Sequence, residues 1–507
     1  MAKFYLTNAI PYVNGSAHLG HTLEFIISDV TSRYHRLNGD ATLATCGSDE
    51  NGQKILEAAK KEKLEPQQLA DKNTQAFLDH LKHLNVNFNV WRRATDQKLH
   101  WPGVQKLWQL CLKNGDIYKK TYQGLYCVGC EQFYTESELV DGKCPEHLTI
   151  PEKVSEENYF FKLSRYQKQL EELISSDKLQ VLPEIRKNET LGFIRQGLQD
   201  FSVSRPAERL GNWGIPVPGD PSQVMYVWFD ALTIYMTSIG WGYNNKLWQK
   251  WWPADIHVIG KGIYRFHTVY WPAMLLSAHL ALPKTVLVHG YVNSGGQKMA
   301  KSLGNVVDPE QLLKKYGTDP IRYYLLKEIP TQADGDFTED RFKEVYNADL
   351  ANGLGNLTAR IITMAQKFTS GKVPEKIDLK GHSLRKLEVA TWKKVEQKLA
   401  TYELHLALEA VWNFIHAIDK FIDEVKPWVL AKQNKQKEIN AAVFILLDCL
   451  KDLVWLIAAF LPETSQKIAA ALSIEKLLTK NPAYKDSWPS LKPGTKINQI
   501  QPLFPRL

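Results

Sequence analysis

The first 90 residues alternate between strand-like and helical patterns of apolar positions. A short apolar run at 4–7 is followed by a glycine-containing loop, a long amphipathic segment at 18–37 and a second apolar run at 41–46. A strand, a loop and a helix in that order begin a parallel α/β sheet. Three later runs resume the pattern and are expected to be strands of the same sheet: 226–230, 256–259 and 286–289.

Two regions depart from this alternation. Residues from about 115 to 215 hold short strand-like runs, turn residues and three cysteines, which indicates an insertion into the α/β domain. After about residue 336 apolar residues recur at spacings of three and four, which predicts a helix bundle. This helical pattern covers 350–368, 387–421 and 439–471.

The predicted architecture is therefore a Rossmann-type α/β catalytic domain with a parallel sheet, an insertion with a zinc knuckle and a C-terminal all-α bundle. The expected boundaries are 1–115 and 216–292 for the two halves of the α/β domain, 116–215 for the insertion, 293–350 for a connecting region and 351–507 for the bundle.

Composition excludes several classes of protein. With 507 residues, 44% hydrophobic and 23% charged, the chain has the profile of a globular protein of several domains. Its apolar runs are shorter than the roughly 20 residues that span a bilayer. The N-terminus shows no secretory leader pattern, so we expect a cytoplasmic location and no membrane partner.

The net charge of +8 is unevenly distributed. Residues 341–507 contain 25 Lys and Arg against 17 Asp and Glu, whereas the first two thirds are balanced. A basic helical region suits a polyanion such as RNA, because neutralised phosphates release counterions. An ordinary solvent-exposed surface could show the same excess of basic residues.

The loop at 11–21 has the features of a phosphate site. It offers glycines, exposed backbone N–H groups and a helix dipole that favours anions. His18 and His21 are three residues apart and share the first helical turn, where both can donate to phosphates. The same spacing also suits a helix cap or half of a metal site.

A second glycine-flanked loop lies at 295–305. Lys298 and Lys301 are three residues apart there and could fold over a triphosphate as pyrophosphate leaves. By itself, such a pair also fits a solvated surface loop.

Three of the six cysteines lie close together. Cys127 and Cys130 form one pair with two residues between them, and Cys144 and His147 form another, with 13 residues between the pairs. Three thiolates and an imidazole make a closed tetrahedral Zn²⁺ site with a structural role. The alternative is four unrelated residues.

Taken together, the His-Leu-Gly-His helix start and the later Lys-Met-x-Lys-Ser loop resemble class I aminoacyl-tRNA synthetases. The flanking sequence resembles the methionyl enzymes in particular. The segments that carry this resemblance are 7–12, 47–50, 226–232, 266–268 and 271–275.

The resemblance implies a methionine–tRNA ligase that uses ATP with Mg²⁺, forms a methionyl-adenylate, and releases pyrophosphate and AMP as it charges tRNA(Met) for initiation and elongation. Asp49 would bind the methionine ammonium group. The thioether pocket would be lined by Ala9, Ile10, Tyr12, Trp228, Ala231, Tyr235 and His267. ATP and the transition state would be held by His18, Gly20, His21, Lys298 and Lys301. Without the resemblance, Trp228 and Tyr235 would be read as core residues.

Two positions depart from the family pattern. Ala300 stands where the loop motif has Ser, and we expect slower or altered loop closure rather than loss of activity. Gly262 stands where the family usually carries an acidic residue near the ATP ribose, so no ribose contact is assigned there.

The helical third contains the expected anticodon-binding residues. Asn356 and Arg360 are four residues apart on one helix face and can read base edges. Trp428 follows a proline and could stack on an unpaired base. Both segments resemble the surface with which the methionyl family reads the CAU anticodon. A solvated helix face and a core tryptophan are the alternatives.

Other functions stay open at this point. A synthetase for valine, isoleucine or leucine would need a larger insertion for its editing domain, and a cysteine enzyme would hold zinc in its amino-acid pocket. A zinc-containing RNA-binding protein without catalysis is a further alternative. The expected oligomeric state is a monomer.

Overall fold

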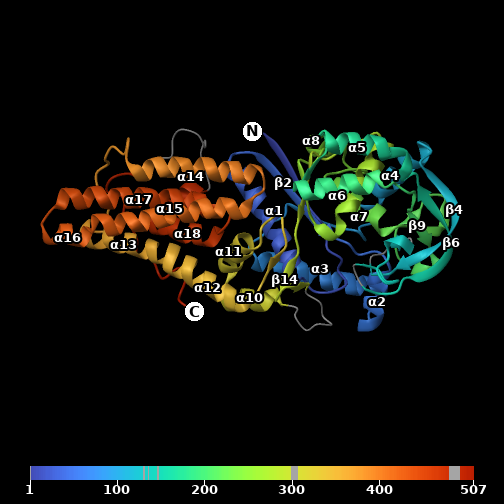
Figure 1. The fold of residues 1–507 in the computed structure, drawn as a ribbon, viewed down its shortest axis with the longest axis horizontal. Helices are drawn as coiled ribbons and strands as arrows, with labels where there is room; N and C mark the ends of the chain where they lie inside the picture. The colour runs from blue at the N-terminus through green and yellow to red at the C-terminus, as the bar shows by residue number, and fades with distance from the viewer. Residues whose placement is uncertain (1, 130–131, 135, 146–147, 299–306, 479–490) are drawn as a thin grey trace.

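The computed structural model describes residues 2–129, 132–134, 136–145, 148–298, 307–478 and 491–507. Figure 1 shows an elongated molecule with the parallel sheet near its middle. Helices α13 to α18 lie alongside one another at one end, and the antiparallel strands β4 and β6 lie at the other.

The central sheet has six parallel strands in the order β3-β2-β1-β12-β13-β7. Their bounds are Val90–Arg93 (β3), Ala41–Ser48 (β2), Lys3–Asn8 (β1), Ile256–Gly260 (β12), Thr285–His289 (β13) and Gln180–Leu182 (β7). The chain leaves β1 toward β2 on one side, while β12 lies on its other side, so the order reverses between β1 and β12. Ligands of open α/β sheets bind beyond the carboxyl ends of the strands at such a switch point.

Four of the five expected strands agree with the structure, and one expectation is wrong. The run 226–230 is not a strand, because β11 (Asp220–Met225) ends before it and Val227–Thr237 forms helix α7. Every residue of α7 is buried, so the segment has no polar face to reveal a helical period.

Helices of the α/β part cover both faces of the sheet. They are α1 (Leu19–Leu37), α2 (Gln53–Glu62), α3 (Pro66–His83), α4 (Trp101–Lys113), α5 (Gln167–Ser175), α6 (Glu184–Arg195), α7, α8 (Asn245–Trp251) and α9 (Trp271–Ser277). Strand β7 and helices α5 and α6 come from within residues 116–215, so part of the expected insertion completes the central sheet.

Most of the remainder of that region forms an antiparallel sheet in the order β5-β4-β6-β8. Its strands are Gln132–Tyr134 (β5), Ile117–Cys127 (β4), Glu152–Phe161 (β6) and Phe201–Ser202 (β8). Two small sheets adjoin the α/β part. One joins β10 (Pro216–Val217), β11 and β9 (Ser204–Pro206), and the other joins β15 (Gln297–Lys298), β14 (Val292–Ser294) and β16 (Gly335–Asp336).

The last third is helical, as predicted. Its elements are α10 (Pro309–Tyr316), α11 (Thr318–Glu328), α12 (Glu339–Val345), a π-helical segment (Tyr346–Gly355), α13 (Asn356–Phe368), α14 (Ser383–Ala400), α15 (Leu404–Val425), α16 (Pro427–Lys432), α17 (Gln436–Ala458), α18 (Pro462–Ala471) and α19 (Glu475–Leu478). One apolar core runs from the sheet into this bundle. No helix in the described part of the chain is long and apolar enough to cross a membrane.

Candidate functional site

The first turn of α1 lies just beyond the carboxyl end of β1, at the switch point of the sheet. His18 caps this helix, since its Nδ1 accepts hydrogen bonds from the backbone N–H groups of Gly20 (3.1 Å) and His21 (3.3 Å). In return, Nδ1 of His21 accepts from the N–H of His18 at 3.4 Å, and the two rings stack with centroids 3.7 Å apart. Both the cap and the expected side-by-side placement of the histidines are therefore present.

The surroundings of both histidines favour the neutral imidazole. Desolvation lowers the pKa of His18 below its usual value, although the residue is exposed. The pKa of His21 also lies well below its usual value, through desolvation and the neighbouring imidazoles. Because Nδ1 accepts in both rings, the ring proton belongs on Nε2, which leaves Nε2–H as a donor suited to an anion.

The second predicted loop begins in a hairpin at the same edge of the sheet. Strand β14 follows β13, and Lys298 pairs with Asn293 in the β14–β15 ladder. Gly295 and Gly296 form the turn with φ of 61° and 75°, which glycine adopts without strain. Ala300 and Lys301 lie outside the described residues, as does everything else from 299 to 306.

The residues expected to line the thioether pocket fall into two contacting groups. Trp228 stacks on Phe266 with ring centroids 3.9 Å apart and meets Tyr12 edge-on at 6.2 Å. The hydroxyl of Tyr235 donates to Nε2 of His267 at 2.7 Å. Residues 228, 231 and 235 lie on one face of α7, so Ala231 stands between the two aromatic side chains of that helix. The structure thus brings Trp228 and Tyr235 of α7 into contact with Phe266 and His267.

His267 is fixed as an acceptor toward Tyr235. Its Nδ1–H donates to the carbonyl of Ile263 at 3.0 Å, and burial lowers the pKa of His267 to about 4. The residue lies in a π-helical turn, Phe266–Tyr270, a distortion that often marks functional sites. Ala9 and Ile10 follow β1 directly, and the N–H of Ala9 donates to the carbonyl of Val258 at 2.9 Å. These contacts make a preorganised, mostly apolar cluster.

Asp49 follows the end of β2 and is 1% exposed. Its N–H donates to the carbonyl of Pro11 at 2.9 Å, and its own carbonyl accepts from the N–H of Val13 at 3.1 Å. Asp49 is therefore held against the loop that carries Tyr12 and leads from β1 to α1. A buried carboxylate in this position can bind an ammonium group.

Sequence reasoning did not assign two contacts at this site. Phe266 is the stacking partner of Trp228, and the ammonium of Lys54 lies 4.0 Å from the ring centroid of Tyr12. Phe266 lies in the segment 266–268 that resembles the family and is adjacent to His267, so the sequence could have indicated it as a pocket residue. Nothing in the spacing of Lys54 indicates its contact, because the loop conformation brings the residues together.

The expected zinc ligands are only partly described. Cys127 and Cys144 are buried in one small cluster with Tyr134, although they are 17 positions apart in the chain. Sγ of Cys144 lies 3.5 Å from the hydroxyl of Tyr134. Cys130 and His147 lie outside the described residues. Among the described residues alone, no group of three or more potential metal ligands occurs.

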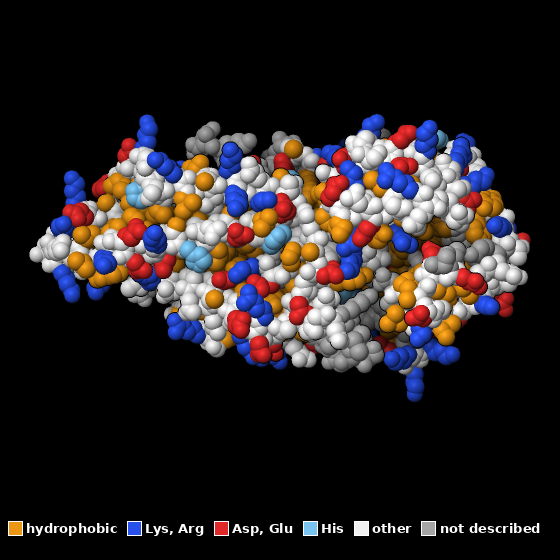
Figure 2. Space-filling model, in the orientation of Figure 1, with side chains coloured by type: hydrophobic (Ala, Val, Ile, Leu, Met, Phe, Trp, Pro, Cys, Tyr) orange, Lys and Arg blue, Asp and Glu red, His pale blue; other side chains and the backbone are white. Residues whose placement is uncertain are grey.

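The three expected anticodon-binding residues lie on α13 and α16 of the bundle. Asn356 begins α13, directly after the π-helical segment. Arg360, one turn later, forms ion pairs with Asp419 and Asp423 of α15, the latter at 2.6 Å. Trp428 follows the end of α15 and is 41% exposed, so it is not a core residue. On the face shown in Figure 2, Lys and Arg side chains are interspersed with Asp and Glu over both halves of the molecule.

Comparison with protein families matches almost the whole chain. The model "tRNA synthetases class I (M)" matches residues 4–150 and 147–362, and the model "Anticodon-binding domain of tRNA ligase" matches 384–502. The methionine–tRNA ligase of Clostridium acetobutylicum is 40% identical over all of this chain and 78% of its own length. That of Synechocystis sp. is also 40% identical, over 99% of this chain and 97% of its own length.

Solved structures agree with this result. The Mycobacterium tuberculosis methionyl-tRNA synthetase in complex with methionyl-adenylate is similar with a TM-score of 0.93 and 35% identity, and each chain is covered completely. Its apo form has a TM-score of 0.85 and 33% identity, with 100% of this chain and 98% of the other covered. On the combined match of family models, relatives and fold, this chain belongs to the methionyl-tRNA synthetase family of class I.

Proposed function

We propose that the chain activates methionine with ATP and transfers it to tRNA(Met). The observation that carries this proposal is the arrangement at the switch point of the sheet. There, the buried residue Asp49 pairs with the loop of Tyr12, whose ring meets Trp228, and this loop leads to the two stacked histidines at the start of α1. Such a site can hold an ammonium group, a thioether and phosphates at the same time.

The first step joins the two substrates. The methionine carboxylate attacks the α-phosphorus of ATP, the P–O bond to the β-phosphate breaks, and pyrophosphate leaves. Asp49 holds the ammonium, the pocket around Trp228 holds the side chain, and Nε2–H of His18 and His21 donates to phosphate oxygens. Lys298 and Lys301 are proposed to neutralise the leaving pyrophosphate, which Mg²⁺ accompanies.

In the second step a terminal ribose hydroxyl of tRNA attacks the carbonyl of the adenylate, and AMP leaves. The helical third would select the tRNA. Trp428 is exposed and offers a flat face to a base. Asn356 and Arg360 lie on α13, whose last residue, Phe368, accepts a hydrogen bond from Gln436, four residues after the end of α16. We propose that these three residues read the CAU anticodon.

Charging of tRNA transcripts tests the whole reaction. We expect methionine to be attached to a tRNA(Met) transcript with a CAU anticodon, and attachment to fall steeply when one anticodon base is changed. Equal charging of both transcripts would contradict the anticodon assignment. Failure of both, with active methionine-dependent exchange, would contradict the tRNA assignment.

We also propose structural zinc at Cys127, Cys130, Cys144 and His147. The donor set fits, because two of the thiols are buried in one cluster, Cys127 at the end of β4 and Cys144 in the segment after β5. Zinc would close the tip of the antiparallel sheet by tying these turns together. Metal analysis should find about one zinc per chain, and Cys127→Ala should lose it. A protein that folds unchanged without zinc would contradict the assignment.

The monomeric state and the cytoplasmic location stay predictions.

A further inference from the structure

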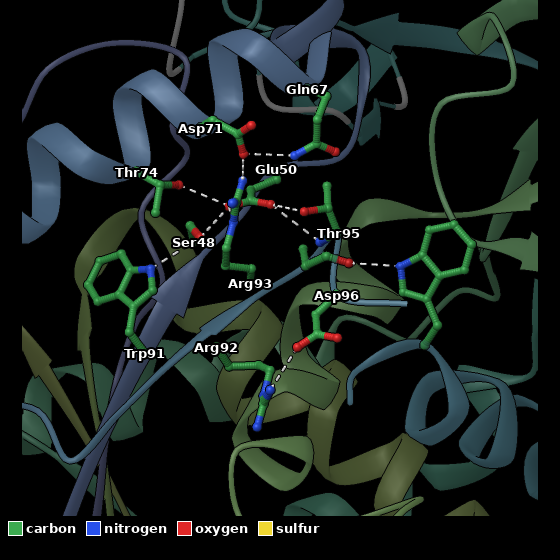
Figure 3. A network of polar contacts seen from close by, with 12 residues as sticks. Ser48, Glu50, Gln67, Asp71, Thr74, Trp91, Arg92, Arg93, Thr95 and Asp96 are labelled. Atoms are coloured by element: carbon green, nitrogen blue, oxygen red, sulfur yellow. Dashed lines mark hydrogen bonds and ion pairs between the residues drawn. The ribbon is translucent and has the colours of Figure 1, made fainter. Parts of the chain in front are cut away.

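The residue after Asp49 is a second buried carboxylate with a different environment. Glu50 has no exposed surface, and its side chain accepts from several donors drawn from three parts of the chain (Figure 3). These donors are the hydroxyls of Ser48 (2.6 Å), Thr74 (2.9 Å) and Thr95, the N–H of Thr95 (3.3 Å) and Nε of Arg93 (2.6 Å). With its lone pairs so occupied, Glu50 cannot serve as a ligand for substrate.

Arg93 provides the compensating charge. It is the last residue of β3 and pairs in register with Ser48, the last residue of β2, which places it beside the turn that carries Asp49. Its guanidinium also forms an ion pair with Asp71 of α3 at 2.6 Å. These two carboxylates raise the pKa of Arg93, although its partial burial acts in the opposite direction. Arg93 therefore joins the turn after β2 to β3 and α3.

The backbone and the neighbouring side chains of this turn are fixed as well. The indole N–H of Trp213 donates to the carbonyl of Glu50 at 2.9 Å, and the amide of Asn51 donates to Asp230 of α7 at 2.5 Å. Since Asp230 lies two residues after Trp228, the turn is connected to the aromatic pocket. Residues on both sides of Asp49 are thus anchored, which restricts the direction of its carboxylate.

We propose that Glu50 and Arg93 are positioning residues for recognition of the amino acid's ammonium group. The contacts of Glu50 and Arg93 hold the turn so that the Asp49 carboxylate lies where an ammonium can bind. Arg93 also neutralises the buried charge of Glu50, which would otherwise repel the neighbouring carboxylate of Asp49. Neither residue touches substrate. The inference rests on the proposed function, because it assigns Asp49 as the ammonium ligand.

The test replaces Arg93 and measures the KM for methionine and the KM for ATP. In Arg93→Met the KM for methionine should rise by up to about 100-fold, because small displacements of a binding group have effects of that size. The KM for ATP should not change, since the histidines of α1 contact neither residue. Arg93→Lys, which keeps the charge but lacks the planar guanidinium with its several donors, should restore part of the affinity for methionine.

Arg92→Met is the matched control. Arg92 is adjacent on β3, forms its ion pair with Asp96 at 2.9 Å and donates to Tyr243 at 3.0 Å, and has no bond to Glu50. General damage to β3 should affect both variants equally, whereas loss of positioning should affect only Arg93→Met. If Arg93→Met does not fold, Glu50→Gln, which keeps the shape of the side chain, replaces it with the same expectation.

Equilibrium binding of two methionine analogues separates the ammonium from the rest of the substrate. Methioninol keeps the ammonium and lacks the carboxylate, while 4-(methylthio)butanoate lacks the ammonium. Arg93→Met should weaken binding of methioninol and leave binding of the butanoate unchanged. Equal weakening of both, or a parallel rise in the KM for ATP, would overturn the proposal. Absence of methionine-dependent exchange in the unmodified protein would instead overturn the proposed function.

Discussion

Buried polar side chains occur both at the carboxyl edge of the sheet and at the junction with the helical third, and the two sets are arranged differently. At the edge they lie at the ends of β1 and β13 and on α1, in a hydrogen-bonded chain from Ser28 through Asn8 to Glu24 and His289. At the junction, Arg322 is fully buried and joins Asp29 of α1 to the backbone carbonyls of Phe460 and Ala459 at the end of α17. The first set lies at the edge where we propose that the substrates bind, and the second ties two parts of the chain together.

This difference separates two kinds of effect. A substitution at the edge should change substrate constants before it changes the free energy of unfolding. A substitution at the junction should do the reverse. Four predictions follow this order, from the largest expected effect to the smallest.

Arg322→Met should cause the largest loss of stability. Removing the guanidinium leaves the buried carboxylate of Asp29 with only Arg33 as its charged partner and three carbonyls without a donor, at a cost of about 3–5 kcal/mol. Urea denaturation measures this loss. At temperatures where the variant is folded, its KM for methionine should equal that of the unmodified protein. A raised KM would contradict the distinction between residues that affect binding and residues that affect stability.

Asp49→Asn should show the opposite behaviour. Loss of one partner of a buried charge pair with the substrate ammonium corresponds to about 2–5 kcal/mol of binding free energy. The KM for methionine should rise by the matching factor, while the KM for ATP stays constant. Pyrophosphate exchange at varied methionine and ATP gives both constants, and a rise in the KM for ATP alone would refute the role of Asp49.

Trp428→Ala should separate the two chemical steps. Loss of one stacked base is worth about 1–3 kcal/mol, so aminoacylation should weaken accordingly while methionine-dependent exchange is retained. The free energy of unfolding should change little, because the side chain is exposed. Val429→Ala, an exposed neighbour at 37%, is the control. Equal loss in both assays would make Trp428 structural.

The pH dependence of stability gives the smallest effect. The pKa of His267 is lowered to about 4 in the folded protein, whereas an unfolded histidine titrates near 6.5. The unfolded state therefore binds more protons between these values, and stability falls as pH decreases from 6.5 to 4. His267→Gln should reduce this slope by about 1.4 kcal/mol per pH unit at most. An unchanged slope in urea titrations would contradict the assignment.

Local sequence predicted much of the fold but only part of the site. The strand at 4–7, the helix at 18–37 and the strands at 256–259 and 286–289 were readable from periodicity, because each has its own apolar pattern. The run 226–230 was misread as a strand, since a helix buried on all sides has no polar face. The edge strand β7 was hidden inside the expected insertion because its three residues carry no pattern of their own.

The same limit applies to side chains. The histidine pair of α1 was predictable because both residues lie within one helical turn. The contact between Glu50 and Arg93 was not, because it depends on the register of β2 against β3, which brings residues 43 positions apart together. The placement of Trp228 against Phe266 likewise depends on packing between α7 and the π-helical turn.

Exchange of labelled pyrophosphate into ATP, measured with each of the twenty amino acids and without tRNA, tests the central claim most directly. We expect exchange with methionine alone, because Asp49 and the aromatic pocket are proposed to select the amino acid before tRNA binds. Exchange with another amino acid would overturn the pocket assignment, and no exchange with any of the twenty would contradict catalysis by this chain.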